Sequence, residues 1–518
     1  MKKIAIYDTT LRDGTQREGI SLSLADKLKV TRLLDNLGVE YIEGGWPGSN
    51  PKDAAYFEAI QALDLKYARI AAFGSTCRKN NDPVTDPNIV ALVEAHTPVV
   101  TVVGKTSMLH VTDVLQTTAQ ENLRMIHDSI AYLKSLDKEV IYDAEHFFDG
   151  VKLDLEYALE TVDAAIGGGA DVVVLCDTNG GSMPWEVSQF VELVKKSFPN
   201  INLGIHTHND GELAVANSLA AVHAGVVQVQ GTVNGYGERC GNANLCSIIP
   251  DLELKMGYRC LPSQGNLENI TLVSRTIAEI ANLAPDNHLA YVGKSAFAHK
   301  GGIHVAAIRR NVNSYQHIDP NLVGNEMRIL VSDLSGQGNL LSKADEFGMS
   351  VSRDEAIKVL EEIKQQEHDG FVFEGAEASV AIRLHRAKPD YKPIFTLIDF
   401  TVLVSENQGN SLSQAMVKIE VDGDFVHTAA DGNGPVNALD LALRKALIHR
   451  YPQLASFRLA DYKVRIPDSN NGTAATTRVL IDTQNGYARW STVGAGTNII
   501  QASWLALVDS IEYGLTLA

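Results

Sequence analysis

The sequence of 518 residues lacks several features that would point to other classes of protein. Its five cysteines have no Cys-x-x-Cys spacing, which argues against a disulfide framework or a zinc ribbon and favours a reducing compartment. No apolar run approaches the roughly 20 residues of a membrane span, and the N-terminal residues lack a signal-peptide pattern. We therefore expect a cytoplasmic protein without a membrane partner.

Basic residues are also few. The chain has 45 Lys and Arg against 63 Asp and Glu, a net charge of −18, so no dominant basic face is available for nucleic acid. Neither a phosphate-binding Gly-x-x-x-x-Gly-Lys loop nor a Met-Lys-Met biotinyl motif occurs, which argues against nucleoside triphosphate and biotin chemistry. The length and the ordinary composition predict a globular chain of roughly two to four domains.

The first half of the chain alternates short apolar runs with helical patterns. Strands that alternate with helices along the chain indicate a parallel sheet. A (β/α)₈ barrel has eight such strands in about 250 residues, as predicted here. An open, doubly wound sheet is the competing interpretation. The expected strands are residues 4–7, 41–45, 68–73, 99–103, 139–142, 171–176, 202–205 and 226–230. The clearest helical patterns are 23–37, 184–198 with Ser182 as a cap, and 213–224.

Polar residues follow these strands at their C-terminal ends, where barrel active sites are built. The pairs Arg12-Asp13 and Glu145-His146 follow the first and fifth strands, and Thr178 follows the sixth. Such a concentration at one end favours the barrel over the open sheet. The other polar residues in these positions are Asp8, Glu43, Ser75, Lys105, Asp177, His206, His208, Glu238, Arg239 and Asn242.

His206 and His208 are two residues apart in a strand, so their imidazoles project from the same face. Asp13 and Asn242 come from neighbouring strand ends, because the eighth strand closes on the first. Two imidazoles, a carboxylate and an amide oxygen suit a divalent ion, and Mg²⁺, Mn²⁺, Co²⁺ and Zn²⁺ all fit. The alternative is a pair of hydrogen-bonded loop histidines.

After about residue 265 the pattern changes. We expect helices at 266–283 and 353–366, and strands at 371–373, 378–384, 395–404, 415–421, 463–466 and 476–482. Two Gly-x-Gly turns, Gly432 with Gly434 and Gly494 with Gly496, precede helices at about 436–449 and 498–511. The tail therefore looks like two strand-rich units that each end in a helix. Tight turns are the expected reason for these glycines.

Several segments resemble the isopropylmalate/homocitrate/citramalate synthase family. The similar segments are 8–16 (DTTLRDGTQ), 206–210 (HTHND), 231–243 (GTVNGYGERCGNA), 299–304 (HKGGIH), 432–436 (GNGPV) and 496–500 (GTNII). They span nearly the whole chain in the family's order. Segment 43–51 (EGGWPGSNP) is similar to the citramalate synthase branch.

The resemblance implies a Claisen-type condensation of acetyl-CoA with pyruvate, followed by thioester hydrolysis, in isoleucine biosynthesis. It implies Asp13, His206, His208 and Asn242 as ligands of a divalent ion, Mg²⁺ or Mn²⁺ first, with Zn²⁺ or Co²⁺ as alternatives. A barrel of residues 1–285, linker subdomains of 286–370 and a regulatory and dimerisation domain of 371–518 are expected. The expected partners are the two substrates, a second copy of the chain and an isoleucine effector.

The other expected roles fall on five residues. Arg12 would stabilise the developing alkoxide, Thr178 would bind the substrate carboxylate, and Glu145 would position substrate or transfer a proton. By resemblance, His304 would be the general base, with Tyr315 beside it.

Each role has a plainer alternative. Arg12 could form a structural ion pair, Thr178 could cap a turn, Glu145 could be exposed, and His304 and Tyr315 could pack in a linker. The glycines Gly432, Gly434, Gly494 and Gly496 could only start helices. Other activities that remain open are 2-isopropylmalate synthesis, a lyase or aldolase reaction, and a non-catalytic amino-acid sensor.

Overall fold

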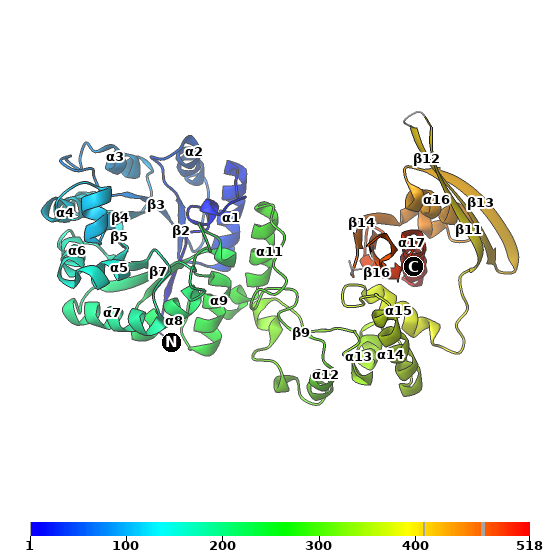
Figure 1. Ribbon diagram of the computed structural model, residues 1–518. Helices are drawn as coiled ribbons and strands as arrows, with labels where there is room; N and C mark the ends of the chain where they lie inside the picture. The colour runs from blue at the N-terminus through cyan, green and yellow to red at the C-terminus, as the bar shows by residue number, and fades with distance from the viewer. Residues whose placement is uncertain (1, 408–409, 468–471, 518) are drawn as a thin grey trace. The chain divides into compact units, whose positions relative to one another are not determined.

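A computed structural model describes residues 2–407, 410–467 and 472–517, so Met1 and Ala518, the outer ends of the expected domains, lie outside the described residues (Figure 1). The chain divides into two compact units. The first contains Met1–Phe297 and Ile318–Glu326, and the second contains Ala298–His317 and Met327–Ala518. In the described residues no helix is long and apolar enough to cross a membrane.

The first unit is a closed barrel of eight parallel strands in chain order, which confirms the predicted (β/α)₈ architecture. Each observed strand overlaps its prediction, and most extend one to three residues further at the C-terminal end. The strands are β1 (Ala5–Asp8), β2 (Tyr41–Gly45), β3 (Arg69–Ser75), β4 (Val99–Lys105), β5 (Glu139–Glu145), β6 (Val172–Asp177), β7 (Asn202–Thr207) and β8 (Gln228–Gly231).

Helices follow the strands, and local sequence signals set their ends. Ser23 caps the first helix by accepting from the Asp26 backbone N–H, and Gly38 ends it with a φ of 92°. The helices are α1 (Leu24–Leu37), α2 (Pro51–Ile60), α3 (Pro87–Glu94), α4 (Ala119–Ser135), α5 (Phe147–Leu153), α6 (Leu155–Gly167), α7 (Pro184–Ser197), α8 (Ala214–Ala224), α9 (Leu245–Pro250), α10 (Gln264–Leu267) and α11 (Ile270–Ile280).

Two helix predictions in this unit are wrong. Ser182 does not cap α7, because its hydroxyl donates to Asp177 at 2.9 Å and Met183 occupies the N-cap position. The predicted helix 266–283 is split into α10 and α11, since the chain leaves the helical hydrogen-bond pattern between them. Apolar periodicity continues through the break, which is why the sequence pattern did not reveal it.

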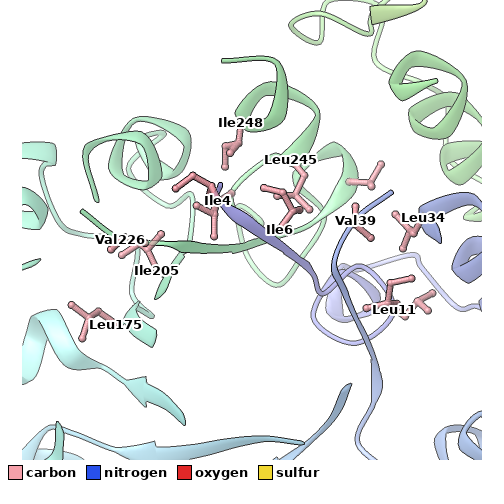
Figure 2. Close-up of a cluster of buried hydrophobic side chains, with 14 of the residues drawn as sticks. Ile4, Ile6, Leu11, Leu34, Val39, Leu175, Ile205, Val226, Leu245 and Ile248 are labelled. Atoms are coloured by element: carbon pink, nitrogen blue, oxygen red, sulfur yellow. The ribbon is translucent and has the colours of Figure 1, made fainter. Parts of the chain in front are cut away.

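Alternation along the strands separates two layers of core. Inside the barrel, Tyr7, Ile141 and Val174 belong to a buried cluster of inward-facing side chains. Outside it, Ile6 of β1 packs in the larger cluster between strands and helices. Figure 2 shows Ile6 with Leu245 and Ile248 of α9 around it. The packed interior leaves the barrel mouth as the place for chemistry.

The second unit begins with short elements and three longer helices. They are β9 (Ala298–His299), α12 (Gly302–Ile308), β10 (Arg328–Ile329), α13 (Gln337–Glu346), α14 (Arg353–His368) and α15 (Glu377–Arg386). The predicted strand 378–384 is wrong, because these residues lie in α15 and are buried throughout. The predicted strand 371–373 is also wrong. Phe371 and Phe373 stack in an irregular segment, with ring centroids 5.9 Å apart.

The remainder forms two three-stranded antiparallel sheets, each followed by a helix, as the tail pattern predicted. They comprise β11 (Thr396–Asn407), β12 (Asn410–Val421), β13 (Asp424–Gly432) and α16 (Pro435–Leu447), then β14 (Arg458–Arg465), β15 (Thr477–Gln484), β16 (Arg489–Gly496) and α17 (Ile499–Thr516). The sequence analysis missed β13 and β16. The exposed face of β13 carries Phe425, His427, Ala429 and Asp431, a mixed set with no β-branched residue, so β13 lacks the usual strand signal.

Of the four glycines before α16 and α17, Gly432 and Gly494 are explained by close packing rather than by the expected tight turns. None of the four has a positive φ. A Cβ on Gly432 would lie 2.4 Å from the Ala438 nitrogen, and one on Gly494 would lie 2.0 Å from the Ala502 oxygen. Both strand ends therefore approach the following helix too closely for a side chain. A Cβ on Gly434 or Gly496 would meet no atom within 4 Å, so these two positions are not constrained in this way.

Candidate metal centre and active site

The C-terminal ends of the barrel strands bring together the residues expected as ligands. Asp13, His206 and His208 are buried, and one potential ligand atom of each lies within 4.8 Å of the others. The Nε2 atom of His206 is 3.3 Å from Oδ2 of Asp13, and the two imidazole centroids are 5.3 Å apart. Two imidazoles and one carboxylate form a donor set suited to a divalent ion.

A buried amide chain fixes the orientation of His206. Gln230 donates from Nε2 to Asp143 at 2.9 Å, which turns its Oε1 toward Nδ1 of His206 at 2.7 Å. The Gln230 oxygen can only accept, so Nδ1 of His206 carries the hydrogen. In its neutral form His206 therefore has its lone pair on Nε2, the atom that faces Asp13.

Two buried polar atoms at this site have no hydrogen-bond partner among the described residues. They are Nδ1 of His208 and Oδ1 of Asn242. Leaving a buried acceptor unpaired costs on the order of 1–3 kcal/mol, which a bound ligand would offset. The amide nitrogen of Asn242 donates to Tyr236 at 3.3 Å, so the oxygen is the atom left over. These residues therefore fit a divalent ion.

Gly237 makes room for Asn242. With a φ of 154°, a Cβ at this position would lie 2.1 Å from the Asn242 amide nitrogen. Only glycine accommodates both the backbone conformation and this approach. The glycine-rich segment after β8 thus positions the Asn242 amide.

Arg12 lies beside the three ligand candidates. Its Nε donates to Glu43 at 2.9 Å, its Nη2 forms an ion pair with the same carboxylate, and its Nη1 is 3.2 Å from Oδ2 of Asp13. The guanidinium carbon also lies 3.8 Å from the Phe73 ring centroid. The ion pair considered as an alternative therefore exists. It fixes the guanidinium beside the ligand candidates, where Arg12 also lines a cavity at the barrel mouth, referred to below as the mouth cavity. The ion pair therefore does not exclude substrate binding by Arg12.

The charges at the site are strongly coupled. Burial alone would raise the pKa of Asp13, but the Arg12 charge and the His206 hydrogen bond hold that pKa well below its ordinary value. Burial alone would lower the pKa of His206, yet the hydrogen bond and charge of Asp13 raise it to about 9. Burial and the neighbouring His206 lower the pKa of His208 to about 4. These shifts leave Asp13 anionic, His206 cationic and His208 neutral at pH 7, so binding of a cation at Nε2 of His206 would displace a proton.

A cavity of about 590 Å³ opens above these residues. Arg12, Asp13, Glu145, Thr178 and His208 all line it. The Thr178 hydroxyl oxygen accepts from the His146 backbone N–H at 2.9 Å, so its hydrogen is left to donate into the cavity. Thr178 does not cap the following turn in this arrangement.

Glu145 is not a free surface carboxylate. It forms an ion pair with Lys105 at the end of the neighbouring strand, and its side chain is 25% exposed. Because both side chains line the cavity, the pair presents an oriented carboxylate to it.

The other predicted residues belong to the second unit. His304 of α12 and Tyr315 are exposed, and their rings stack with centroids 4.1 Å apart. The pairing of His304 with Tyr315 is present, whereas their action on the barrel stays a prediction. Gly432, Gly434, Gly494 and Gly496 also lie in the second unit.

Sequence reasoning missed the supporting residues Asp143 and Gln230. The predicted fifth strand ended at residue 142, which put Asp143 in a loop. The observed strand continues to Glu145, so Asp143 faces inward. Gln230 had a usable signal, since a glutamine in a short, fully buried strand needs a polar partner. Glu43, Lys105, Arg12 and Glu145 were all noted from the sequence, but the pairing of Glu43 with Arg12 and of Lys105 with Glu145 was not foreseen.

Comparisons with known proteins agree with this arrangement. The HMGL-like family model matches residues 3–277, a homocitrate synthase post-HMGL domain-like model matches 291–370, and the LeuA allosteric (dimerisation) domain matches 374–515. An (R)-citramalate synthase of Aquifex aeolicus is 51% identical over 99% of this chain and 98% of its own length. The chain belongs to the citramalate synthase group of the HMGL-like family.

Other relatives locate the chain within this family. An (R)-citramalate synthase of Geobacter sulfurreducens is also 51% identical, over 99% of this chain and 98% of its own length. A 2-isopropylmalate synthase of Pyrococcus furiosus is 30% identical over 99% of both chains. The difference in identity agrees with segment 43–51, which pointed to the citramalate synthase branch of the HMGL-like family.

Proposed function

We propose that the protein is an (R)-citramalate synthase that condenses acetyl-CoA with pyruvate and water to give (R)-citramalate and CoA. The observation that carries the proposal is the buried triad of Asp13, His206 and His208, of which Asp13 and His208 line a cavity together with Arg12. The 51% identity to named (R)-citramalate synthases over nearly the full length supports it. Isoleucine biosynthesis is the corresponding pathway.

Asp13, His206, His208 and Asn242 would hold a divalent ion, for which Mg²⁺ or Mn²⁺ are the first candidates and Zn²⁺ or Co²⁺ the alternatives. When bound, such an ion supplies Lewis acidity for the ketone of a 2-oxo acid. Asp13 contributes the negative charge, and the two imidazoles and the Asn242 amide contribute neutral donors. Because Gln230 accepts from Nδ1 of His206, the neutral form of this imidazole would offer the lone pair of Nε2 to the ion.

Three cavity residues would bind and orient pyruvate. The Thr178 hydroxyl donates to the substrate carboxylate, since its oxygen already accepts from His146. Arg12 is anchored by Glu43 and stabilises the negative charge that develops on the ketone oxygen. Glu145 is held by Lys105 and positions the substrate or relays a proton.

The reaction requires removal of a proton from the acetyl methyl group. His304 takes this proton, with Tyr315 stacked against its ring. The methyl carbon then bonds to the ketone carbon of pyruvate, and the resulting alkoxide gains a proton. Water cleaves the thioester, giving the second carboxylate and free CoA. The proposed base His304 and its neighbour Tyr315 belong to the expected linker subdomains of residues 286–370, and the proposed metal ligands belong to the expected barrel domain of residues 1–285.

Residues 371–518 would serve dimerisation and feedback by isoleucine, in keeping with the matched domain description. The N-terminus of α16 follows Gly432 and Gly434 and has no side-chain cap, so its N–H groups suit an amino-acid carboxylate. Asn498 already caps α17, after Gly494 and Gly496. We therefore assign the effector carboxylate to α16 and expect a homodimer.

A free-thiol assay with acetyl-CoA and a panel of 2-oxo acids tests the function. Pyruvate should give the highest kcat/KM, the product should be (R)-citramalate, and omission of the oxo acid should abolish release. A preference for 2-oxoisovalerate would assign the chain to 2-isopropylmalate synthesis. Thiol release with none of the acids would leave a lyase, an aldolase or a non-catalytic sensor.

A further inference from the structure

Arg239 connects three loops at the barrel mouth. It lies in the segment that follows β8, and it lines the mouth cavity. Its Nε and Nη2 donate to the two carboxylate oxygens of Asp210, in the loop after β7, at 2.8 and 2.9 Å. The same Nη2 donates to the carbonyl oxygen of Thr178, in the segment after β6, at 2.7 Å. One guanidinium therefore joins the ends of β6, β7 and β8.

Two features distinguish this arrangement from an ordinary surface ion pair. The contact with Asp210 is two-pronged, and a third hydrogen bond runs to a backbone carbonyl, which only the planar fork of an arginine can combine in this way. The backbone of Arg239 also has a φ of 57°, in the left-handed region that a residue with a side chain rarely adopts. Surrounding contacts have to hold such a conformation, and it is common at ligand-binding sites.

Thr178 is held at two points by neighbouring loops. The His146 backbone N–H, after β5, donates to the Thr178 hydroxyl oxygen at 2.9 Å, and Arg239 donates to the carbonyl oxygen. No other donor in the described part of the chain contacts this carbonyl oxygen. Because threonine is β-branched and its χ1 is restricted, the orientation of its backbone largely decides where its hydroxyl points. Arg239 thus controls the direction of a hydroxyl that faces the mouth cavity.

We propose that Arg239 is a positioning residue, which keeps the Thr178 hydroxyl directed at the carboxylate of the 2-oxo acid by holding the Thr178 carbonyl oxygen. The inference rests on the proposed function, in which Thr178 binds that carboxylate. Arg239 acts through Thr178 and touches no reacting atom in this scheme. The carboxylate is bound equally before and during the reaction, so loss of Arg239 should weaken substrate binding and leave the rate at saturation unchanged.

The experiment compares Arg239→Gln with the wild type as full-length enzymes. Arg239→Gln should raise the KM for pyruvate about tenfold, because a hydrogen bond to a charged group loses its alignment. The kcat and the KM for acetyl-CoA should stay within about twofold of the wild type. Arg239→Lys should recover only part of the loss, since an ammonium group lacks the planar fork.

Arg124 on α4 offers a matched control. Its Nε and Nη2 donate to both carboxylate oxygens of Glu121 at 2.9 and 2.7 Å, and its Nη2 donates to the Asn81 carbonyl oxygen at 3.2 Å. The side chains of Arg124 and Arg239 are 34% and 39% exposed, but Arg124 does not line the mouth cavity. Arg124→Gln therefore removes the same kinds of contact and should leave the KM for pyruvate unchanged.

A double variant tests whether Arg239 acts through the Thr178 hydroxyl. Thr178→Val removes this hydroxyl and should raise the KM for pyruvate by itself. Arg239→Gln combined with Thr178→Val should then have the same KM as Thr178→Val alone, because the two changes remove one interaction. A KM for pyruvate that rises further in the double variant would overturn the proposal. An unchanged KM in Arg239→Gln would also overturn it and make the contact with Asp210 purely structural.

Calorimetry with pyruvate on the Mn²⁺-loaded full chain repeats the comparison without turnover. Arg239→Gln should bind pyruvate about tenfold more weakly than the wild type, while Arg124→Gln should bind it equally well. Pyruvate binding that depends on Arg239 and Thr178, without thiol release from any 2-oxo acid, would refute the proposed function and leave the positioning role standing. Thiol release from pyruvate with wild-type kinetics in Arg239→Gln would refute the positioning role and leave the proposed function standing.

Discussion

Two buried ionic clusters in this protein differ in how completely they are paired. The mouth cluster of the barrel comprises Arg12, Asp13, Glu43, His206 and His208, and the α15–α17 cluster comprises Arg383, Arg386, Asp509 and Glu512. In the second cluster Asp509 accepts from Ser379 at 2.9 Å and pairs with both arginines, while Glu512 accepts from Arg386 and Tyr391. In the first, Nδ1 of His208 and the adjacent Oδ1 of Asn242 have no partner in the described part of the chain.

The difference in pairing separates buried charges that stabilise the fold from buried charges that bind a ligand. A closed network satisfies its own members and holds two helices together, so its loss should be felt as stability. A cluster that retains unpaired atoms is less stable than it could be, and a ligand supplies the missing partners. This distinction would be wrong if a substitution in the α15–α17 cluster reduced activity without affecting stability, or if a substitution in the mouth cluster reduced stability without affecting activity.

The largest expected effect on stability is in the α15–α17 cluster. Asp509→Ala leaves the buried Arg383 without its nearest carboxylate, whereas Arg386, whose side chain is 32% exposed, keeps Glu512. We expect a loss of about 3–5 kcal/mol in the free energy of unfolding. Urea unfolding should detect this loss, while the specific activity of the folded enzyme should stay within twofold. Asp390→Ala, at an exposed position, is the matched control and should be near neutral. Wild-type stability of Asp509→Ala would mean that the closed network is not structural.

In the mouth cluster, substitution of an arginine should lower the catalytic rate rather than the stability. Arg12→Lys keeps the positive charge but loses the two-point contact with Glu43 and the N–H groups facing the cavity. We expect kcat to fall by about 10²–10³, the range seen when a donor to a developing oxyanion is removed. Thiol-release kinetics measure this. A variant that keeps full kcat and only unfolds more easily would make Arg12 a structural residue like Arg383.

Asp8 is a buried carboxylate that belongs to neither cluster, and its contribution to the free energy of unfolding should depend on pH. Burial raises the pKa of Asp8 to about 7, although Thr10 donates to both of its oxygens. In the unfolded chain the pKa is about 4, so between these values the folded state holds the extra proton. The contribution of Asp8 to stability therefore falls as pH rises from about 4 to 7 and stays low above 7.

Replacing Asp8 by Asn removes this dependence. The Tm of Asp8→Asn minus that of the wild type should increase between pH 5 and pH 8, by the equivalent of at most about 3 kcal/mol. Thermal unfolding in a series of buffers measures the difference. Asp64→Asn, at an exposed position, should show a flat difference. A difference that shrinks with rising pH would contradict the sign of the assigned shift.

The smallest expected effect concerns Gln230, which touches no substrate in this scheme. Gln230→Met removes the acceptor for His206 Nδ1 while preserving side-chain length, and should weaken divalent-ion affinity by about 10–100-fold. Saturating the variant with the ion should restore most of the kcat. A loss of kcat that no ion concentration restores would show that Gln230 acts elsewhere.

The sequence predicted the barrel well because its strands are buried on both faces and its helices carry clear end signals, as at Ser23 and Gly38. The triad was predictable because His206 and His208 share a strand face and Asp13 follows β1, which only β8 separates from β7 in the closed barrel. Pairings such as Arg12 with Glu43 depend on the rotation of long side chains across strands, which periodicity does not encode. Segment 378–384 was misassigned because alternating Val380 and Ile382 suit a strand as well as a buried helix.

The most direct test of the account is divalent-ion binding by the wild-type full chain. After treatment with chelator, a titration with Mn²⁺ followed by its spin-resonance signal should reveal one bound ion per chain. Asp13→Asn should lose that ion while keeping the circular dichroism spectrum of the wild type. Thiol release with pyruvate should rise with the fraction of ion bound. Full activity in the ion-free protein, or Mn²⁺ binding by Asp13→Asn equal to that of the wild type, would contradict the claim that the unpaired groups at the barrel mouth bind a divalent ion.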